Sequence, residues 1–124
     1  MALQNNTLIY QGLLIKESIS DEIILDYVTV TKVELWKTEG YPKYWTALSF
    51  TTNQQDFPEL LSKVVISNET VGNWFVDMKS GNTKFIIFKD KILKYKIGNA
   101  KEKEQVYEEC RKLGIPNQQL NWPE

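Results

Sequence analysis

Apolar and polar residues alternate along much of the chain, which is the pattern of β-strands with one buried face. The alternation predicts six strands, over residues 8–16, 28–38, 44–52, 73–78, 83–89 and 91–97. Turn-forming residues separate several of them, at 39–42, 80–82 and 90–91. The strands over 28–38 and 44–52 are therefore predicted to form a long hairpin.

Two of these strands depart from simple alternation. In the 28–38 strand the apolar phase slips between Val30 and Val33, which predicts a β-bulge near residues 31–32. In the 83–89 strand apolar residues occupy both faces. This strand is therefore expected to lie in the middle of a sheet, with something packed on each side.

Two short helices are predicted between the strands. Ser20 is a favourable N-cap for a helical turn over 20–27, and acids in its first turn suit the helix dipole. Asp56 followed three residues later by Glu59 is a capping-box pattern, which predicts a helix over 57–64.

A third helix has the clearest boundaries. Asn99 can cap its start, and Gly114 suits the position just after its end. Three apolar residues share one face of this helix: Val106, Cys110 and Leu113. Leu120 and Trp122 in the segment that follows are expected to fold back onto the sheet.

The elements together predict an α+β fold, a mostly antiparallel sheet of about six strands with two or three helices packed on one side of it. At 124 residues and without a Pro/Gly-rich linker, the chain is predicted to form a single domain over residues 1–124, with residues 1–6 flexible.

Charge is unevenly distributed although its sum is only −1. Residues 1–40 hold six acids and three lysines, and residues 79–103 hold eight lysines and two acids. Such asymmetry suggests a polar partner that meets one face, although lysine-rich surface hairpins without a partner are common. Arginine is the preferred residue for contacts to guanine and phosphate, and this chain has only one, Arg111. We therefore do not expect sequence-specific DNA recognition.

The residues that commonly carry catalysis are scarce. The chain contains no histidine and one cysteine, Cys110, which lies on the apolar face of the last predicted helix. Zinc-type ligand spacing and glycine-rich phosphate loops are both missing from the sequence. We therefore predict a binding protein rather than an enzyme, with no catalytic residues, no metal and no cofactor.

The sequence also suggests a compartment. No apolar run has the roughly 18–20 residues of a membrane span, and the first ten residues have no signal-peptide pattern. A lone cysteine fits a reducing environment. We expect a cytoplasmic protein without a membrane partner.

Candidate binding residues fall into three groups. The first contains the acids of the helical turn and the hairpin: Asp21, Glu22, Asp26 and Glu39. The second consists of aromatic residues at the hairpin, where strand alternation cannot bury all of Trp36, Tyr41, Tyr44 and Trp45. The third is Asp77, an acid within an apolar strand, which either lies at a sheet rim or is held in place for a partner.

Each group also has a structural explanation. The acids suit a solvated helix start, and the aromatics can cover an open edge of the core. A single-stranded nucleic-acid site would combine these aromatics with a surface formed by Lys84, Lys89, Lys94 and Lys96. Carboxylate catalysis by Asp77 and Glu34 is the enzymatic alternative.

The second half of the chain resembles small bacterial immunity proteins encoded beside polymorphic or contact-dependent growth-inhibition toxins. Five phrases carry the resemblance: NWFVD at 73–77, FIIF at 85–88, ILKY at 92–95, LGIP at 113–116 and QLNW at 119–122. They span about residues 72–123, less than half of the chain, and none is a catalytic signature.

The resemblance implies a protein that binds one cognate toxin domain, often a nuclease, and blocks its active site or the access of substrate. Such families share no functional residues that could be transferred to positions of this chain. A nuclease has a basic cleft, so the acid-rich first 40 residues are the better candidate for the contact. The alternative function is a small-ligand or nucleotide-binding module, with aromatic residues on the concave face of a curved sheet.

Overall fold

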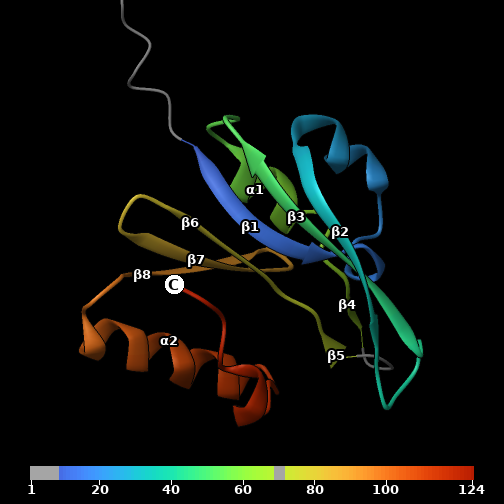
Figure 1. Ribbon diagram of the computed structural model, residues 1–124. Helices are drawn as coiled ribbons and strands as arrows, with labels where there is room; N and C mark the ends of the chain where they lie inside the picture. The colour runs from blue at the N-terminus through green and yellow to red at the C-terminus, as the bar shows by residue number, and fades with distance from the viewer. Residues whose placement is uncertain (1–8, 69–71) are drawn as a thin grey trace, which may run out of the picture.

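The computed structural model describes residues 9–68 and 72–124 and is built around a six-stranded antiparallel sheet (Figure 1). The strand order is β2-β3-β1-β6-β7-β8. These strands are β1 (Tyr10–Ile15), β2 (Thr29–Lys37), β3 (Tyr44–Thr52), β6 (Val76–Ser80), β7 (Thr83–Phe88) and β8 (Lys91–Lys96). A short separate pair is formed by β4 (Ser67–Asn68) and β5 (Gly72–Asn73). The predicted α+β class is confirmed.

The helical elements are α1 (Phe57–Ser62), α2 (Ala100–Lys112) and the 3₁₀ turns η2 (Lys16–Ser18), η3 (Glu22–Tyr27) and η4 (Asn117–Gln119). Across residues 9–68 and 72–124, none of the helices is long and apolar enough to span a membrane. Residues 1–6, which the sequence predicts to be flexible, lie outside the described residues.

Each face of the sheet carries its own hydrophobic cluster. On one face α1 inserts Phe57 among residues of β1, β3, β6 and β7. On the other face α2 and the segment after it place Cys110 and Trp122 against β7 and β8. Figure 1 shows α1 behind the sheet and α2 below β8. β7 serves both clusters, because successive strand residues point to opposite faces: Ile87 enters the first and Ile86 the second.

The prediction that helices cover one side of the sheet is therefore wrong, whereas the prediction that the 83–89 strand is packed on both sides is confirmed. The physical reason is the two-faced apolar pattern of β7. Because both of its faces are apolar, each must be covered, and one helix can cover only one face.

The long hairpin is present, and its bulge lies where the sequence predicts it. β2 pairs with β3, and the register shifts between Val30 and Lys32. The hydroxyl of Thr31, the extra residue, donates a hydrogen bond to the Ser49 carbonyl oxygen at 3.2 Å. The bulge returns Val33 to the face of Val30, which is why the apolar phase slips in the sequence.

A narrow junction joins the two halves of the sheet. β1 and β6 share three paired positions, and the middle one is Gly12 opposite Met78. A Cβ atom on Gly12 would lie 2.5 Å from the Asp77 carbonyl oxygen and 2.6 Å from the Met78 Cβ. Glycine therefore allows β1 and β6 to approach each other closely at this point.

The last helix has the predicted ends. The Asn99 side chain accepts a hydrogen bond from the Glu102 backbone N–H at 3.0 Å, and Gly114 follows the helix with φ 87°. Leu120 and Trp122 are buried in the cluster beneath α2. The predicted cap and the predicted return of this segment onto the sheet are both confirmed.

The caps of the first two helical elements differ from the prediction. Asp21, rather than Ser20, accepts from the Ile23 N–H at 3.0 Å and caps η3. The Ser20 hydroxyl instead donates to the Val64 carbonyl oxygen. Asp56 makes no side-chain cap to α1, and accepts from the Gln54 side chain at 2.6 Å. In both places the side chain expected to cap the helix binds another partner instead. For Ser20 the partner is Val64, far away in the sequence, and for Asp56 it is Gln54, two residues away.

Candidate functional site

Strand β2 forms one edge of the six-stranded sheet. Among the described residues it pairs with β3 alone, so the backbone N–H and C=O groups on its outer side have no strand to bind. Its nine residues span about 30 Å, at roughly 3.3 Å per residue. A long unpaired edge of this kind is a ready site for another strand.

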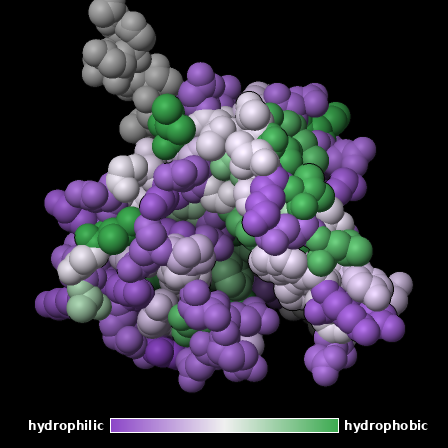
Figure 2. Space-filling model, viewed as in Figure 1, coloured by the Kyte–Doolittle hydropathy of each residue, from purple (hydrophilic) through white to green (hydrophobic). Residues whose placement is uncertain are grey.

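Three aliphatic side chains are exposed along one face of this edge. Val30, Val33 and Leu35 are 39%, 62% and 69% exposed, and we call them the edge strip. Their partners on β3 are Phe50, Leu48 and Thr46, so all three point to the sheet face that α1 covers elsewhere. Hydrophobic residues gather over the region of β2 in Figure 2. The sequence pattern predicts a buried face for these residues, but the outermost position of β2 leaves them exposed.

Three of the four predicted acids lie at one end of the edge strip, and the exposed predicted aromatics lie at the other end with the fourth acid, Glu39. Asp21, Glu22 and Asp26 are exposed on or beside η3, which precedes β2. Glu39, Tyr41 and Tyr44 are exposed at the hairpin tip, which follows β2. The structure therefore does not bring the two groups into one cluster. The edge strip connects them, and sequence reasoning missed it because strand order cannot be read from local alternation.

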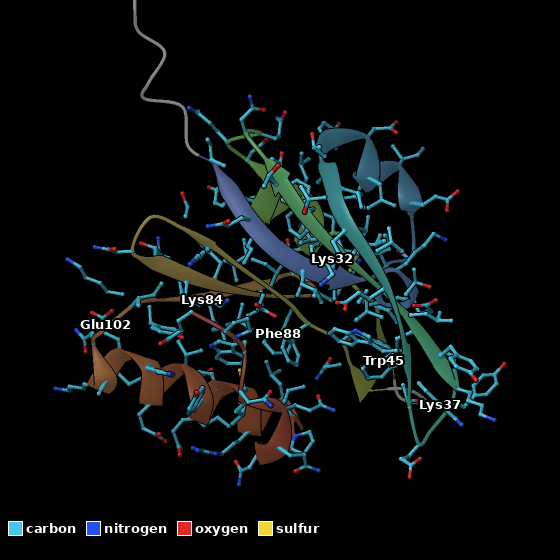
Figure 3. The ribbon with its side chains drawn as sticks, in the orientation of Figure 1. Lys32, Lys37, Trp45, Lys84, Phe88 and Glu102 are labelled. Carbon is cyan, nitrogen blue, oxygen red and sulfur yellow. The ribbon has the colours of Figure 1, made fainter. Side chains whose placement is uncertain are left out.

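The two ends of the edge differ in charge. At the η3 end, one of the three acids, Glu22, pairs with Lys16 at 3.3 Å, which leaves Asp21 and Asp26 to set an acidic character. At the tip, Lys37 and Lys43 outnumber Glu39. Figure 3 shows Lys37 at the far end of the hairpin. The edge thus runs from an acidic end to a basic end.

Trp45 lies on the opposite face of the hairpin from the edge strip. Trp45, labelled in Figure 3, is the cross-strand partner of Trp36. Its ring meets that of Trp74 edge-on, with centroids 5.1 Å apart. Its Nε1 is buried and has no hydrogen-bond partner among the described residues. Trp36, Tyr41 and Tyr44 are exposed, which confirms that the hairpin cannot bury all four aromatics.

Asp77 lies apart from the edge, on β6. Its carboxylate binds Lys84 Nζ at 2.8 Å, and Lys84 Nζ also donates to the Pro123 carbonyl oxygen at 2.6 Å. Burial raises the pKa of Asp77 above its usual value, while the charge of Lys84 acts in the opposite direction. Lys84 is 2% exposed, so the expectation that it belongs to a lysine-rich surface is wrong.

The segment after α2 is held over this ion pair by further polar contacts. The Tyr95 hydroxyl donates to the Glu124 carboxylate and accepts from Trp122 Nε1 at 2.9 Å. Lys103 pairs with the same carboxylate at 3.2 Å. Burial raises the pKa of Tyr95, and the hydrogen bond from Tyr95 lowers the pKa of Glu124. These contacts explain why Asp77 and Lys84 are covered. The ion pair therefore serves the packing of the fold.

Cys110 is fully buried in the cluster beneath α2, as its place on the apolar helix face predicts. Burial raises the pKa of its thiol to about 11. Within the described part of the chain, no group of three or more His, Cys, Asp or Glu side chains could hold a metal ion. An open groove of about 630 Å³ lies between β8 and α2, and its lining mixes Leu93 and Ile92 with Lys96 and Glu109.

No protein-family model, curated protein or solved structure matches this chain. The functional argument below therefore rests on its own residues.

Glu17 fixes the hairpin against the rest of the sheet. Its two carboxylate oxygens accept from the Thr46 backbone N–H at 2.8 Å and from the Thr46 hydroxyl at 2.9 Å, just beyond the last pair of β1 and β3. Burial alone would raise the pKa of Glu17, but the hydrogen bonds from Thr46 outweigh it and hold the pKa below the usual value.

We expect Glu17→Gln to flatten the acid limb of the stability profile. A carboxyl group whose pKa is lowered by folding stabilises the folded state fully above its unfolded pKa of 4.5, and this stabilisation is lost as the pH falls through the folded pKa. Urea unfolding at neutral pH and at several values below pH 4.5 measures the profile. Glu39→Gln at the exposed tip is the control, and identical profiles for Glu17→Gln and wild type would contradict the prediction.

Proposed function

We propose that this chain is a toxin-neutralising immunity protein, which binds a cognate toxin domain along the β2 edge and blocks its active site or the access of its substrate. The observation that carries the proposal is the edge strip, three exposed apolar residues on a strand whose outer side is unpaired among the described residues. The apolar strip is flanked by exposed acids at its η3 end and by exposed lysines and tyrosines at the hairpin tip, and an apolar centre with a polar and aromatic surround is typical of protein interfaces. The proposal places the protein in the bacterial cytoplasm, where a reduced thiol is stable.

Charge favours a basic partner at the η3 end of the edge. Asp21 and Asp26 are exposed there, and neither forms an ion pair among the described contacts. A toxin that cleaves nucleic acid needs a basic surface to hold its substrate, so acids at the inhibitor's surface complement it and speed association. A nuclease toxin is therefore the class of partner that fits best.

The alternative of a small-ligand module receives less support from the geometry. It needs aromatic side chains around a concave site. Tyr41 and Tyr44 instead project at the exposed hairpin tip, and Trp45 packs against Trp74. The groove between β8 and α2 is open, and its one aromatic residue, Tyr95, is 2% exposed and bound to Glu124.

We expect Leu35→Asp to remove toxin protection without unfolding the protein. Leu35 is 69% exposed, so the substitution costs little folding free energy, whereas in a complex it would bury an unpaired carboxylate. The test expresses the toxin domain encoded beside the gene in bacteria, with the wild-type chain or with the variant, and counts survivors. At least a hundredfold loss of protection is expected, since burying an unpaired charge costs roughly 3 kcal/mol or more.

Ile9→Asp provides the matched control. Ile9 is 61% exposed, close to the value for Leu35, but it lies before β1, away from the edge strip. This variant should protect as well as wild type. Failure of the wild-type chain to bind the neighbouring toxin, or a locus that encodes no toxin, would refute the proposed function.

A further inference from the structure

We infer that the free protein pairs with a second copy of itself through β2, forming an antiparallel strand-to-strand dimer centred on Val33. The pairing would extend the six-stranded sheet of each copy across a two-fold axis. The dimer is inferred for the free chain and does not depend on the proposed function. Only the idea that the dimer covers the toxin-binding edge rests on that function.

The charge pattern of β2 selects this register. Lys32 and Glu34 point to the same face, since their partners on β3 are Ser49 and Ala47. When Val33 faces its own copy in an antiparallel pair, Lys32 lies opposite Glu34 of the second copy, and the reverse pair forms on the other side of the axis. Opposite charges directly across a strand pair stabilise it, so the register gains two such contacts.

Neighbouring symmetric registers do not have this complementarity. Centring the pair on Glu34 sets two carboxylates opposite each other, and centring it on Lys32 sets two ammonium groups opposite each other. Centring it on Leu35 places Glu34 opposite Trp36, with no charge pair at all. The register centred on Val33 also places the two Val33 side chains, each 62% exposed in the single chain, against each other.

Both ends of the edge support the same arrangement. An antiparallel dimer brings the η3 end of one copy to the hairpin tip of the other. Asp21 and Asp26 at the first end then face the region of Lys37 and Lys43 at the second. The acidic and basic ends, which lie about 30 Å apart in one copy, become neighbours between copies.

The bulge limits the strength of the dimer. Because Thr31 is the extra residue, regular pairing extends over only the few residues around Val33 before it meets the bulge of either copy. A short ladder buries less than a standard interface, so the dimer should dissociate on dilution. A weak dimer hides the edge from non-specific strand addition and releases it to a tighter partner.

Charge reversal on β2 tests the register. In Lys32→Glu each copy presents two acids around the axis, and in Glu34→Lys each presents two lysines, so both variants should dimerise at least about tenfold more weakly than wild type. An equimolar mixture of the two variants restores both opposite-charge pairs. Sedimentation velocity of the full chain over a concentration series should therefore show a dimer in the equimolar mixture. Over the same concentrations it should show no dimer in either variant alone.

Lys32 and Glu34 also form an ion pair within each copy, at 3.5 Å, and both variants break it. Because the side chains are 63% and 41% exposed, this pair contributes little to stability, so thermal unfolding should be little changed in either variant. Glu109→Lys on α2 is the control for a general effect of charge, and it should dimerise like wild type. A wild-type chain that remains monomeric at high concentration overturns the inference. A dimer that is indifferent to both reversals overturns the register.

These results are separable from the proposed function. A monomeric chain that still protects against the toxin would remove the dimer and leave the function standing. A dimer that gives no protection would do the opposite. If both stand, adding the toxin domain should convert the dimer into a complex with one copy of the chain.

Discussion

Gly12→Ala is expected to destabilise the protein by about 3 kcal/mol or more, at the upper end of the cost of overpacking. The new Cβ would lie 2.5 Å from the Asp77 carbonyl oxygen and 2.6 Å from the Met78 Cβ, and neither is the flexible end of a side chain. β1 and β6 would have to separate at the middle of their three paired positions. The entropic benefit of replacing glycine, about 0.4–1 kcal/mol, is too small to offset this.

Urea unfolding followed by tryptophan fluorescence measures the effect. Gly40→Ala is the matched control, since a Cβ at Gly40 meets nothing within 4 Å, and its stability should be close to wild type. A loss below about 1 kcal/mol in Gly12→Ala would show that the strands can separate at little cost.

Asp77→Ala is expected to cost about 3–5 kcal/mol, because it leaves the buried Lys84 ammonium without its counter-charge. Lys84 is 2% exposed and has one other acceptor, the Pro123 carbonyl oxygen at 2.6 Å. Loss of the carboxylate should also loosen the segment that covers the pair. Thermal and urea unfolding measure the stability, and hydrogen exchange at the Trp122 indole measures the loosening.

Two further variants separate charge from packing at this position. Asp77→Asn keeps an oxygen acceptor for Lys84 and should cost less than Asp77→Ala. Replacing both partners, in Asp77→Leu with Lys84→Met, removes the ion pair and should be near neutral. If the double variant were as unstable as Asp77→Ala, the shape of the site rather than an unpaired charge would account for the loss.

Local signals in the sequence predicted the local features of the fold. The phase slip at Thr31 predicted the bulge, Asn99 and Gly114 predicted the ends of α2, and the two-faced pattern of β7 predicted packing on both of its sides. Each of these depends on residues within a few positions of one another, so the pattern contains the needed information.

Features set by strand order could not be predicted in this way. Val33 and Leu35 have the alternation of a half-buried strand, and they are exposed only because β2 is outermost. Lys84 is buried because the segment around Pro123 returns over it, 39 residues later in the sequence. The acids of η3 and the aromatics of the tip were identified as candidates, but their separation along β2 depends on the hairpin in space.

The burial of Cys110 has a practical consequence for experiments on the edge. It is the only cysteine in the chain, it is 0% exposed, and burial raises the pKa of its thiol to about 11. At neutral pH it offers almost no thiolate to a maleimide or a spin-label reagent. A cysteine introduced on β2 can therefore carry a fluorophore or a spin label in the native background, and distances between two labelled copies can then be measured directly.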